Sequence, residues 1–309
     1  MLNPTRYLGV DVSKETLDVA FERRRWQFAN SKEGRRKFIA QIKKLPGPIQ
    51  VVCESTGPYH IPMCLALQEA GIAFTIANPA KIRFFGRSEG TIAKTDAIDA
   101  TLIERFANSK RPLPDPPLCP DHLAINELLA HRSHIINAIK VFRTHKHQVR
   151  DEALLADIDH SIAALEKRLE LAEEKLRLKV EATPAWKEKL DKLTAVEGVG
   201  FLTAVVMIAK MPELGSLNRG QCAALSGLAP YDDTSGKRQG KRSIQGGRHE
   251  VRAALYMAAL SASNFNPVLK DFYQRLRAKK KDFKVAITAV MRKLIIYLNS
   301  LLRSETAAA

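Results

Sequence analysis

The sequence predicts an α/β domain at the N-terminus, a helical connector, and a mostly helical, strongly basic domain at the C-terminus. Short apolar runs typical of strands alternate with amphipathic helical segments up to a proline-rich stretch at residues 111–120. Beyond it, apolar residues recur mainly at helical spacing. Because 309 residues exceed one ordinary domain, we expect domains at residues 1–117, 118–183 and 184–309.

Strands and helices alternate in the predicted first domain. The strand patterns lie at residues 7–12, 17–21, 26–28, 49–54 and 73–77. Helical spacing covers residues 32–44 and about 59–70, where Gly71 provides a C-cap. Leading strands followed by helix–strand alternation indicate a mixed sheet flanked by helices.

A heptad pattern marks the connector. Its apolar residues are spaced alternately by four and three: Ile158, Ile162, Leu165, Leu169, Ala172 and Leu176. This seam fits a coiled coil between chains, a helix packed on its own domain, or an antiparallel pair with a preceding helix at about residues 121–152. The sequence leaves these arrangements open.

The C-terminal domain begins after Thr183-Pro184, and its first motif is a glycine turn. Gly198 and Gly200 lie between two apolar helical segments, as in a helix-hairpin-helix whose turn amides bind a DNA phosphate. Any tight corner between two helices uses similar glycines. A glycine-rich basic loop at residues 235–247 and two or three helices complete the domain.

The net charge of +16 is the first functional signal. An excess of this size favours nucleic acid as a partner, although a merely soluble basic protein is the alternative. The cations gather between residues 237 and 303. We expect phosphate contacts from the turn glycines Gly198 and Gly200 and from Lys237, Arg238, Lys241, Arg242, Arg248 and Arg252.

Membrane, secreted and zinc-ribbon proteins do not fit the composition. No apolar run approaches the roughly 20 residues that cross a bilayer. The first residues lack a signal-peptide layout, so we expect a cytoplasmic, nucleoid-associated protein. The cysteines form no C-x-x-C pair, which argues against a disulfide framework: Cys53, Cys64, Cys119 and Cys222.

Acidic residues form the first candidate site. Asp11 and Glu54 end two predicted strands, and ligands collect at the carboxyl ends of strands in α/β sheets. Asp96 and Asp99 stand three residues apart in the first turns of a helix that Thr95 can cap. Four converging carboxylates repel one another unless Mg²⁺ or Mn²⁺ neutralises them.

Other interpretations of these acids remain open. Two acids early in a helix also stabilise it through the helix dipole. Asp18 and Glu22 compete for the acidic role, although strand alternation predicts that Asp18 faces solvent. Gly-Val-Asp-Val-Ser-Lys at residues 9–14, ahead of a hairpin, is typical of a ribonuclease-H-like fold. Kinases of the actin and sugar-kinase type open similarly, but their glycine-rich phosphate loops are not evident.

A serine in the basic loop is the second candidate site. Ser235 precedes Gly236 and lies among Lys and Arg residues, whose charges would stabilise the transition state of an attack on a DNA phosphodiester. A Ser-Gly turn in a phosphate-binding loop is the structural alternative. Ser243 and Thr234 are alternative nucleophiles.

Taken together, the motifs resemble those of the insertion-sequence 110 family of transposases over nearly the whole chain. They lie at residues 9–14, 54–57, 94–100, 198–200, 227–230 and 235–236. The resemblance implies a Holliday-junction-resolvase (RuvC-like) domain, whose DEDD tetrad corresponds to Asp11, Glu54, Asp96 and Asp99. It also implies a C-terminal transposase domain with Ser235 as the catalytic serine.

Reaction and partners are implied by the same resemblance. The family excises and inserts its element by site-specific recombination through a phosphoserine intermediate. The implied partners are donor and target DNA, a structured guide RNA from the element, and further copies of the chain in a dimer or tetramer. In such oligomers the acidic domain of one protomer meets the serine domain of another.

Two rival functions fit the residues as well. One is a metal-dependent Holliday-junction endonuclease, in which water attacks and Ser235 is structural. The other is a nucleic-acid-binding scaffold without chemistry.

Overall fold

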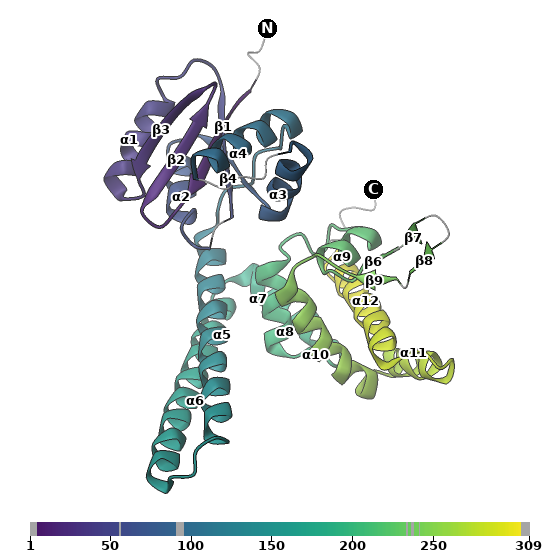
Figure 1. Ribbon diagram of the computed structural model, residues 1–309. Coiled ribbons are helices and arrows are strands. Elements are labelled where there is room, and N and C mark those ends of the chain that lie inside the picture. The colour runs from purple at the N-terminus through teal and green to yellow at the C-terminus, as the bar shows by residue number, and fades with distance from the viewer. Residues whose placement is uncertain are drawn as a thin grey trace. The chain divides into compact units, whose positions relative to one another are not determined.

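The computed structural model describes residues 5–55, 57–90, 96–232, 234–235, 238–240 and 242–303. The chain divides into two compact units, Met1–Cys119 and Pro120–Ala309 (Figure 1). The sequence predicts a first boundary at residue 117 and a further one at residue 183. Within the described residues, no helix is long and apolar enough to cross a membrane.

A five-stranded mixed sheet forms the centre of the N-terminal unit. β1 (Arg6–Val12), β2 (Thr16–Phe21) and β3 (Arg24–Ala29) pair as an antiparallel meander. β4 (Ile49–Glu54) and β5 (Ala73–Ala77) continue the sheet in parallel with β1, which gives the order β3-β2-β1-β4-β5. The predicted mixed sheet is therefore confirmed.

Helices cover both faces of this sheet (Figure 1). α1 (Lys32–Ile42) and α2 (Ile61–Glu69) share one apolar core with the strands. α3 (Pro79–Ser88) and α4 (Asp96–Lys110) share a second core with the opposite face. The unit is therefore a three-layer sandwich, with both faces of its central strands buried.

Strand alternation assigns each β1 side chain to one of the two layers. Leu8 and Val10 belong to the core beneath α1 and α2. Tyr7 belongs to the core beneath α3 and α4, so Gly9 and Asp11 share its face of the sheet.

The predicted connector is a long antiparallel helical hairpin, α5 (Pro120–Lys146) and α6 (Glu152–Glu181). The heptad residues of α6 face α5, in a core that contains Ile135, Ile139, Ile158, Ile162 and Ala172. Among the arrangements left open by the sequence, this is the antiparallel pair with the preceding helix. A coiled coil between chains remains a prediction.

The base of the hairpin and the C-terminal helices share one core. These helices are α7 (Pro184–Thr194), α8 (Phe201–Lys210), α9 (Arg219–Leu225), α10 (His249–Phe265), α11 (Pro267–Ala278) and α12 (Phe283–Leu301). Leu129 and Leu176 from the hairpin join Trp186 of α7 and Leu294 of α12 in it. This shared core is why the connector belongs to the second unit.

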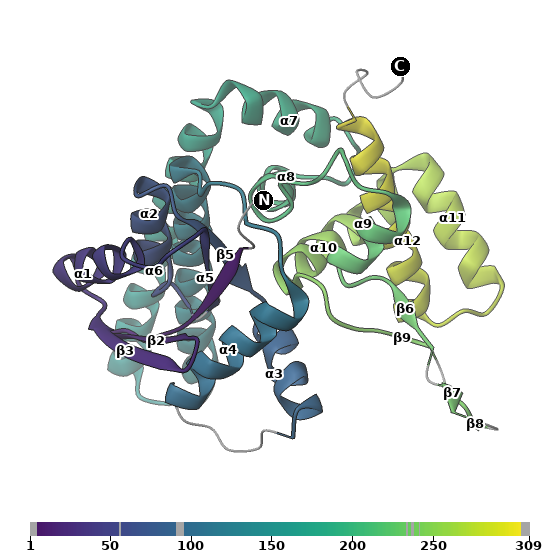
Figure 2. The same cartoon turned by 90° about the horizontal axis from the view of Figure 1, so that it is seen from above.

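A small β-ribbon leaves this helical body between α9 and α10. β6 (Pro230–Tyr231) pairs with β9 (Ser243–Ile244), and β7 (Thr234–Ser235) pairs with β8 (Arg238–Gln239). Both views show β7 and β8 extending away from the helices of their own unit (Figures 1 and 2). The predicted glycine-rich loop is thus a two-step ribbon.

Candidate active site

Asp11 and Glu54 lie side by side at the carboxyl ends of two neighbouring strands. β1 and β4 are parallel, and their last paired residues are Val10 and Cys53. Asp11 and Glu54 are the next residue on each strand, and both are partly buried. Neighbouring strands are about 4.8 Å apart. The predicted pair of strand-end acids therefore occupies adjacent positions.

Both acids lie on the face of the sheet that α4 covers. Val52 packs in the core beneath α3 and α4, and Glu54 follows it by two residues on β4. Gly9 likewise precedes Asp11 by two residues on β1, and α4 lies directly against Gly9. A Cβ atom added to Gly9 would lie 2.4 Å from both the carbonyl oxygen of Ala100 and the amide nitrogen of Glu104. A strand glycine of this kind marks a close backbone approach.

The N-terminal end of α4 points toward the strand-end acids. Tyr7 packs with Ile103 and Phe106, whereas Gly9 lies against Ala100 one turn earlier on α4. The helix therefore runs antiparallel to β1. Two residues of strand advance about 6.6 Å, and four residues of helix advance about 6 Å. By this count, the first turn of α4 lies level with Asp11.

The first turn of α4 carries the other two predicted acids. Asp96 begins the helix and Asp99 follows on the same face, partly buried. The side chain of Asp96 and the predicted cap Thr95 lie outside the described residues. Among the side chains that are described, no three of His, Cys, Asp or Glu form a metal-binding group. The tetrad thus remains a prediction that the backbone arrangement favours.

Asp18 is nearer to this site than the sequence predicts. It pairs with Asp11 across β1 and β2, so the two residues occupy the same face of the sheet. Its carboxylate accepts hydrogen bonds from Thr16 Oγ1 at 3.1 Å and from Gln27 Nε2 at 2.9 Å. The expected solvent-facing residue is in fact partly buried. The other competing acid, Glu22, is held by Arg6 near the opposite end of β1.

The predicted serine lies on the ribbon of the C-terminal unit. Ser235 is the last residue of β7 and pairs with Arg238 of β8. The side chains of Ser235 and Arg238, together with Lys237 and Lys241 as whole residues, lie outside the described part of the structure. Ser243, an alternative nucleophile, is exposed on β9.

Family models and relatives identify the kind of protein that carries these two candidate sites. A model of IS110 DEDD proteins, described as a transposase, matches residues 8–157, and one described as Transposase IS116/IS110/IS902 family matches residues 190–274. Pilin gene-inverting proteins of Moraxella bovis and Moraxella lacunata are 26% identical over an alignment of 314 residues, which covers 97% of this chain and 96% of theirs. An insertion element IS110 protein of 43.6 kDa from Streptomyces coelicolor is 26% identical over 157 residues, 50% of this chain and 38% of its own.

The chain is a transposase of the IS110 family. It is therefore an enzyme that cuts and rejoins DNA, as the sequence predicts. The DEDD model implies a ribonuclease-H/RuvC-like α/β domain and the use of a divalent metal ion. The first matched segment contains the four predicted acids, and the second contains Ser235.

Two of the transposase's predicted phosphate contacts have partners within the protein. Arg248 donates to both carboxylate oxygens of Glu213, at 2.8 and 2.6 Å, and to the carbonyl of Lys210 at 2.7 Å. This ion pair lowers the pKa of Glu213. Arg252 donates to the carbonyl of Gly246 at 2.7 Å. Both arginines therefore hold the root of the ribbon in place.

Another predicted cation, Arg242, is exposed on the ribbon itself and pairs with Asp232. Both residues of this pair are well exposed, so the pair is screened by solvent and readily broken. Arg242 thus stays available to a phosphate, unlike Arg248.

The glycine turn of the transposase combines one packed and one open position. Gly198 has φ +97°, and an added Cβ would lie 2.6 Å from the backbone of Ala262 in α10. Gly200 is the N-cap of α8, is exposed, and has open space where a Cβ would be. Of the two glycines, only Gly200 is therefore accessible to a ligand. The helix-hairpin-helix function of this turn remains a prediction.

Proposed function

We propose that this transposase exchanges DNA strands with two cooperating sites, a metal-binding DEDD tetrad and a nucleophilic serine. The observation that supports the proposal is the adjacency of Asp11 and Glu54 on the face of the sheet covered by α4. Side-by-side carboxylates at strand ends repel each other, so the arrangement favours a cation between them.

The donor set fits a hard divalent cation. Asp11, Glu54, Asp96 and Asp99 offer only carboxylate oxygens, the ligands that Mg²⁺ and Mn²⁺ prefer. When bound there, such an ion supplies an activated oxygen nucleophile and stabilises charge on the phosphate. The partial burial of Asp11, Glu54 and Asp99 strengthens their attraction to a cation relative to open water.

Ser235 is proposed to attack the scissile phosphate. Its oxygen forms a bond to phosphorus, the bond to the leaving deoxyribose oxygen breaks, and the hydroxyl proton passes to solvent while the leaving oxygen takes a proton. The incoming deoxyribose hydroxyl of a partner strand then attacks the phosphoserine and releases the Ser235 oxygen. Positive charge from Lys237, Arg238, Lys241 and Arg242 stabilises both transition states.

Assembly and guidance complete the proposal. The ribbon that carries Ser235 extends from its own unit, which suits a serine that meets the acidic domain of another protomer in a dimer or tetramer. A structured guide RNA is proposed to pair with donor and target DNA. Phosphates of either nucleic acid would contact the ribbon cations and Gly200.

Adduct trapping tests the chemistry. The protein, with its co-purified RNA, is incubated with element-end DNA and Mg²⁺, denatured, and analysed for protein-linked DNA. Wild type and the matched control Ser243→Ala should form the adduct, whereas Ser235→Ala should form none. Cutting that persists in Ser235→Ala would support the metal-dependent junction endonuclease instead. Activity that persists in Asp11→Asn would overturn the role of the tetrad.

A further inference from the structure

A hollow with four arginines in its lining, which we call the arginine hollow, lies on the α4 face of the N-terminal unit, near the end of β1 that is opposite to Asp11. It has a volume of about 660 Å³ and lies between the β2–β3 turn and the helices α3 and α4. Its cations come from Arg23 of the turn, from Arg24 and Arg25 at the start of β3, and from Arg105 of α4, and Asn108 and Ser109 add polar groups. Arg6 marks this end of β1, five residues before Asp11, or roughly 16 Å along the strand.

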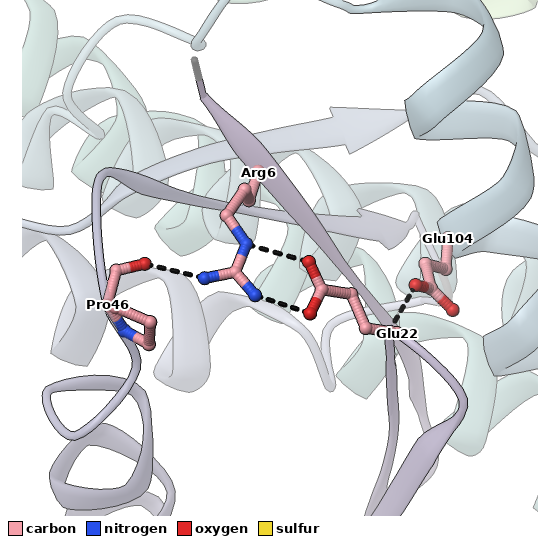
Figure 3. Close-up of polar contacts among 4 residues, drawn as sticks. All are labelled: Arg6, Glu22, Pro46 and Glu104. Atoms are coloured by element: carbon pink, nitrogen blue, oxygen red, sulfur yellow. Dashed lines mark hydrogen bonds and ion pairs between the residues drawn. The ribbon is translucent and has the colours of Figure 1, made fainter. Parts of the chain in front are cut away.

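The turn that presents the arginines has a strained and braced backbone. Glu22 and Arg23 have φ values of +46° and +69°, which a two-residue hairpin turn normally reserves for Asn and Gly. Arg6 holds the Glu22 carboxylate in a bidentate ion pair and donates to the Pro46 carbonyl at 2.7 Å (Figure 3). The Glu22 amide donates to Glu104 at 2.7 Å.

The four arginines of the hollow outnumber its three glutamates, Glu22, Glu89 and Glu104. Glu22 is neutralised by Arg6, which lowers its pKa, and Glu89 is paired with Arg105. Among the described residues, no hydrogen bond or ion pair engages the exposed guanidinium groups of Arg23, Arg24 and Arg25. Arg24 is also attracted electrostatically by the Glu22 carboxylate, which contributes to the lowered pKa of Glu22. Three exposed cations held close together at the junction of β2 and β3 suit a polyanion whose phosphates are evenly spaced.

An aromatic surface adjoins the arginine hollow. Phe85 lines the arginine hollow and also a second one, of about 580 Å³, formed with Phe84, Lys81, Lys110 and Pro112 among others. Phe84 is 66% exposed, and Lys81 and Lys110 line the same hollow. An exposed ring in a hollow that also contains lysines suits the stacking of an unpaired base.

From these features we infer that a single strand of nucleic acid crosses α3 and α4, with phosphates at Arg23, Arg24 and Arg25 and a base against Phe84. This site goes beyond the proposed catalytic function, because it is separate from the tetrad and from Ser235. The helix α4 carries both Asp99 and Arg105, so it links the two sites rigidly. A strand held here is held a few nucleotides from the tetrad.

Binding of a fluorescein-labelled single-stranded oligonucleotide tests the inference, with the full-length protein in EDTA over a series of salt concentrations. Each phosphate contact with a single strand contributes about 0.7 to the log–log salt slope, so R23A/R24A/R25A should lower the slope by about 2. The matched control K32A/R36A/K37A removes three exposed cations from α1 on the opposite face of the sheet and should leave the slope unchanged. Equal slopes for the two triple variants would overturn the inference.

A second binding comparison tests the stacking of a base on Phe84. Phe84→Ala should weaken single-strand binding at least about fivefold and leave duplex binding unchanged, because duplex bases are already stacked. Leu113→Ala, a change at an 85% exposed apolar residue of the same unit, is the control and should change neither. Equal weakening for duplex and single strand would contradict the stacking.

Two further outcomes separate this inference from its rivals. If poly-glutamate displaces the oligonucleotide from wild type and binds R23A/R24A/R25A much more weakly, the hollow binds an acidic protein segment and the inference fails. Asp11→Asn should bind the oligonucleotide with the wild-type slope. A protein that never cleaves DNA but shows the predicted slope difference would overturn the proposed function alone.

Discussion

Gly9→Ala probes the contact that aligns α4 with the strand-end acids. The new Cβ would lie 2.4 Å from backbone atoms of Ala100 and Glu104, where ordinary Cβ contacts begin near 3.4 Å. Backbone atoms of a helix cannot swing aside as a side chain does. The helix must therefore retreat from β1 by about 1 Å.

Such a retreat should affect activity far more than folding. Overpacking of this kind costs about 1–3 kcal/mol in the free energy of unfolding. A misplacement of about 1 Å within a catalytic group can cost roughly 100-fold in rate. Because Asp96 and Asp99 belong to α4, they would move with the helix. We therefore expect Gly9→Ala to fold, to bind DNA, and to cleave it about 100-fold more slowly than wild type.

The measurement is the single-turnover cleavage rate with Mg²⁺, together with a urea unfolding curve. Gly86→Ala is the matched control, since its Cβ meets α4 only at the end of the flexible Leu102 side chain, at 2.8 Å. That variant should cleave within a few-fold of wild type. If Gly9→Ala, correctly folded, cleaves at the wild-type rate, the alignment of α4 with the strand ends does not matter for the reaction.

Three further predictions concern stability. Arg248→Ala should lower the free energy of unfolding by about 1–2 kcal/mol, allowing for the partial exposure of its pair with Glu213, and an unchanged urea midpoint would contradict its anchoring role. Gly198→Ala should destabilise the protein, because its φ is +97° and its Cβ meets Ala262, whereas Gly200→Ala should melt like wild type; equal melting temperatures would refute this contrast. Burial raises the pKa of Glu104 above 4.5, so the folded state binds its proton more tightly and stability should fall as pH rises from 4.5 through the raised pKa. Glu104→Gln should remove that pH dependence of the unfolding free energy, and a slope identical to wild type would show that another group causes it.

The strand-end acids could be predicted because their positions follow from local patterns. An apolar run ending in an acid predicts both the strand and the edge where the acid lies, for Asp11 as for Glu54. The glycine inside the first strand also carries a signal, since Gly9 marks where α4 approaches the backbone. The adjacency of β1 and β4 then follows from the parallel crossover.

Other features depend on contacts that no local pattern encodes. The pairing of Asp18 with Asp11 is set by the register of the β1–β2 hairpin, and a shift of one residue would turn Asp18 to the other face. The sequence predicts Arg248 as a phosphate contact because its partner Glu213 lies 35 residues earlier and no local pattern shows the pairing. The heptad pattern of α6 alone is compatible with a partner chain as well as with α5, and only the structure shows that α5 covers it.

Metal binding tests the central claim most directly. Manganese affinity is measured by electron paramagnetic resonance titration of the full-length wild type and of Asp11→Asn, Glu54→Gln and Asp99→Asn, with Glu33→Gln on α1 as the control. Removing any one carboxylate should weaken binding by roughly tenfold or more, since even indirect partners of a metal matter at that level, and the control should bind like wild type. Wild-type affinity in Asp99→Asn would show that α4 and the strand ends do not share a metal ion.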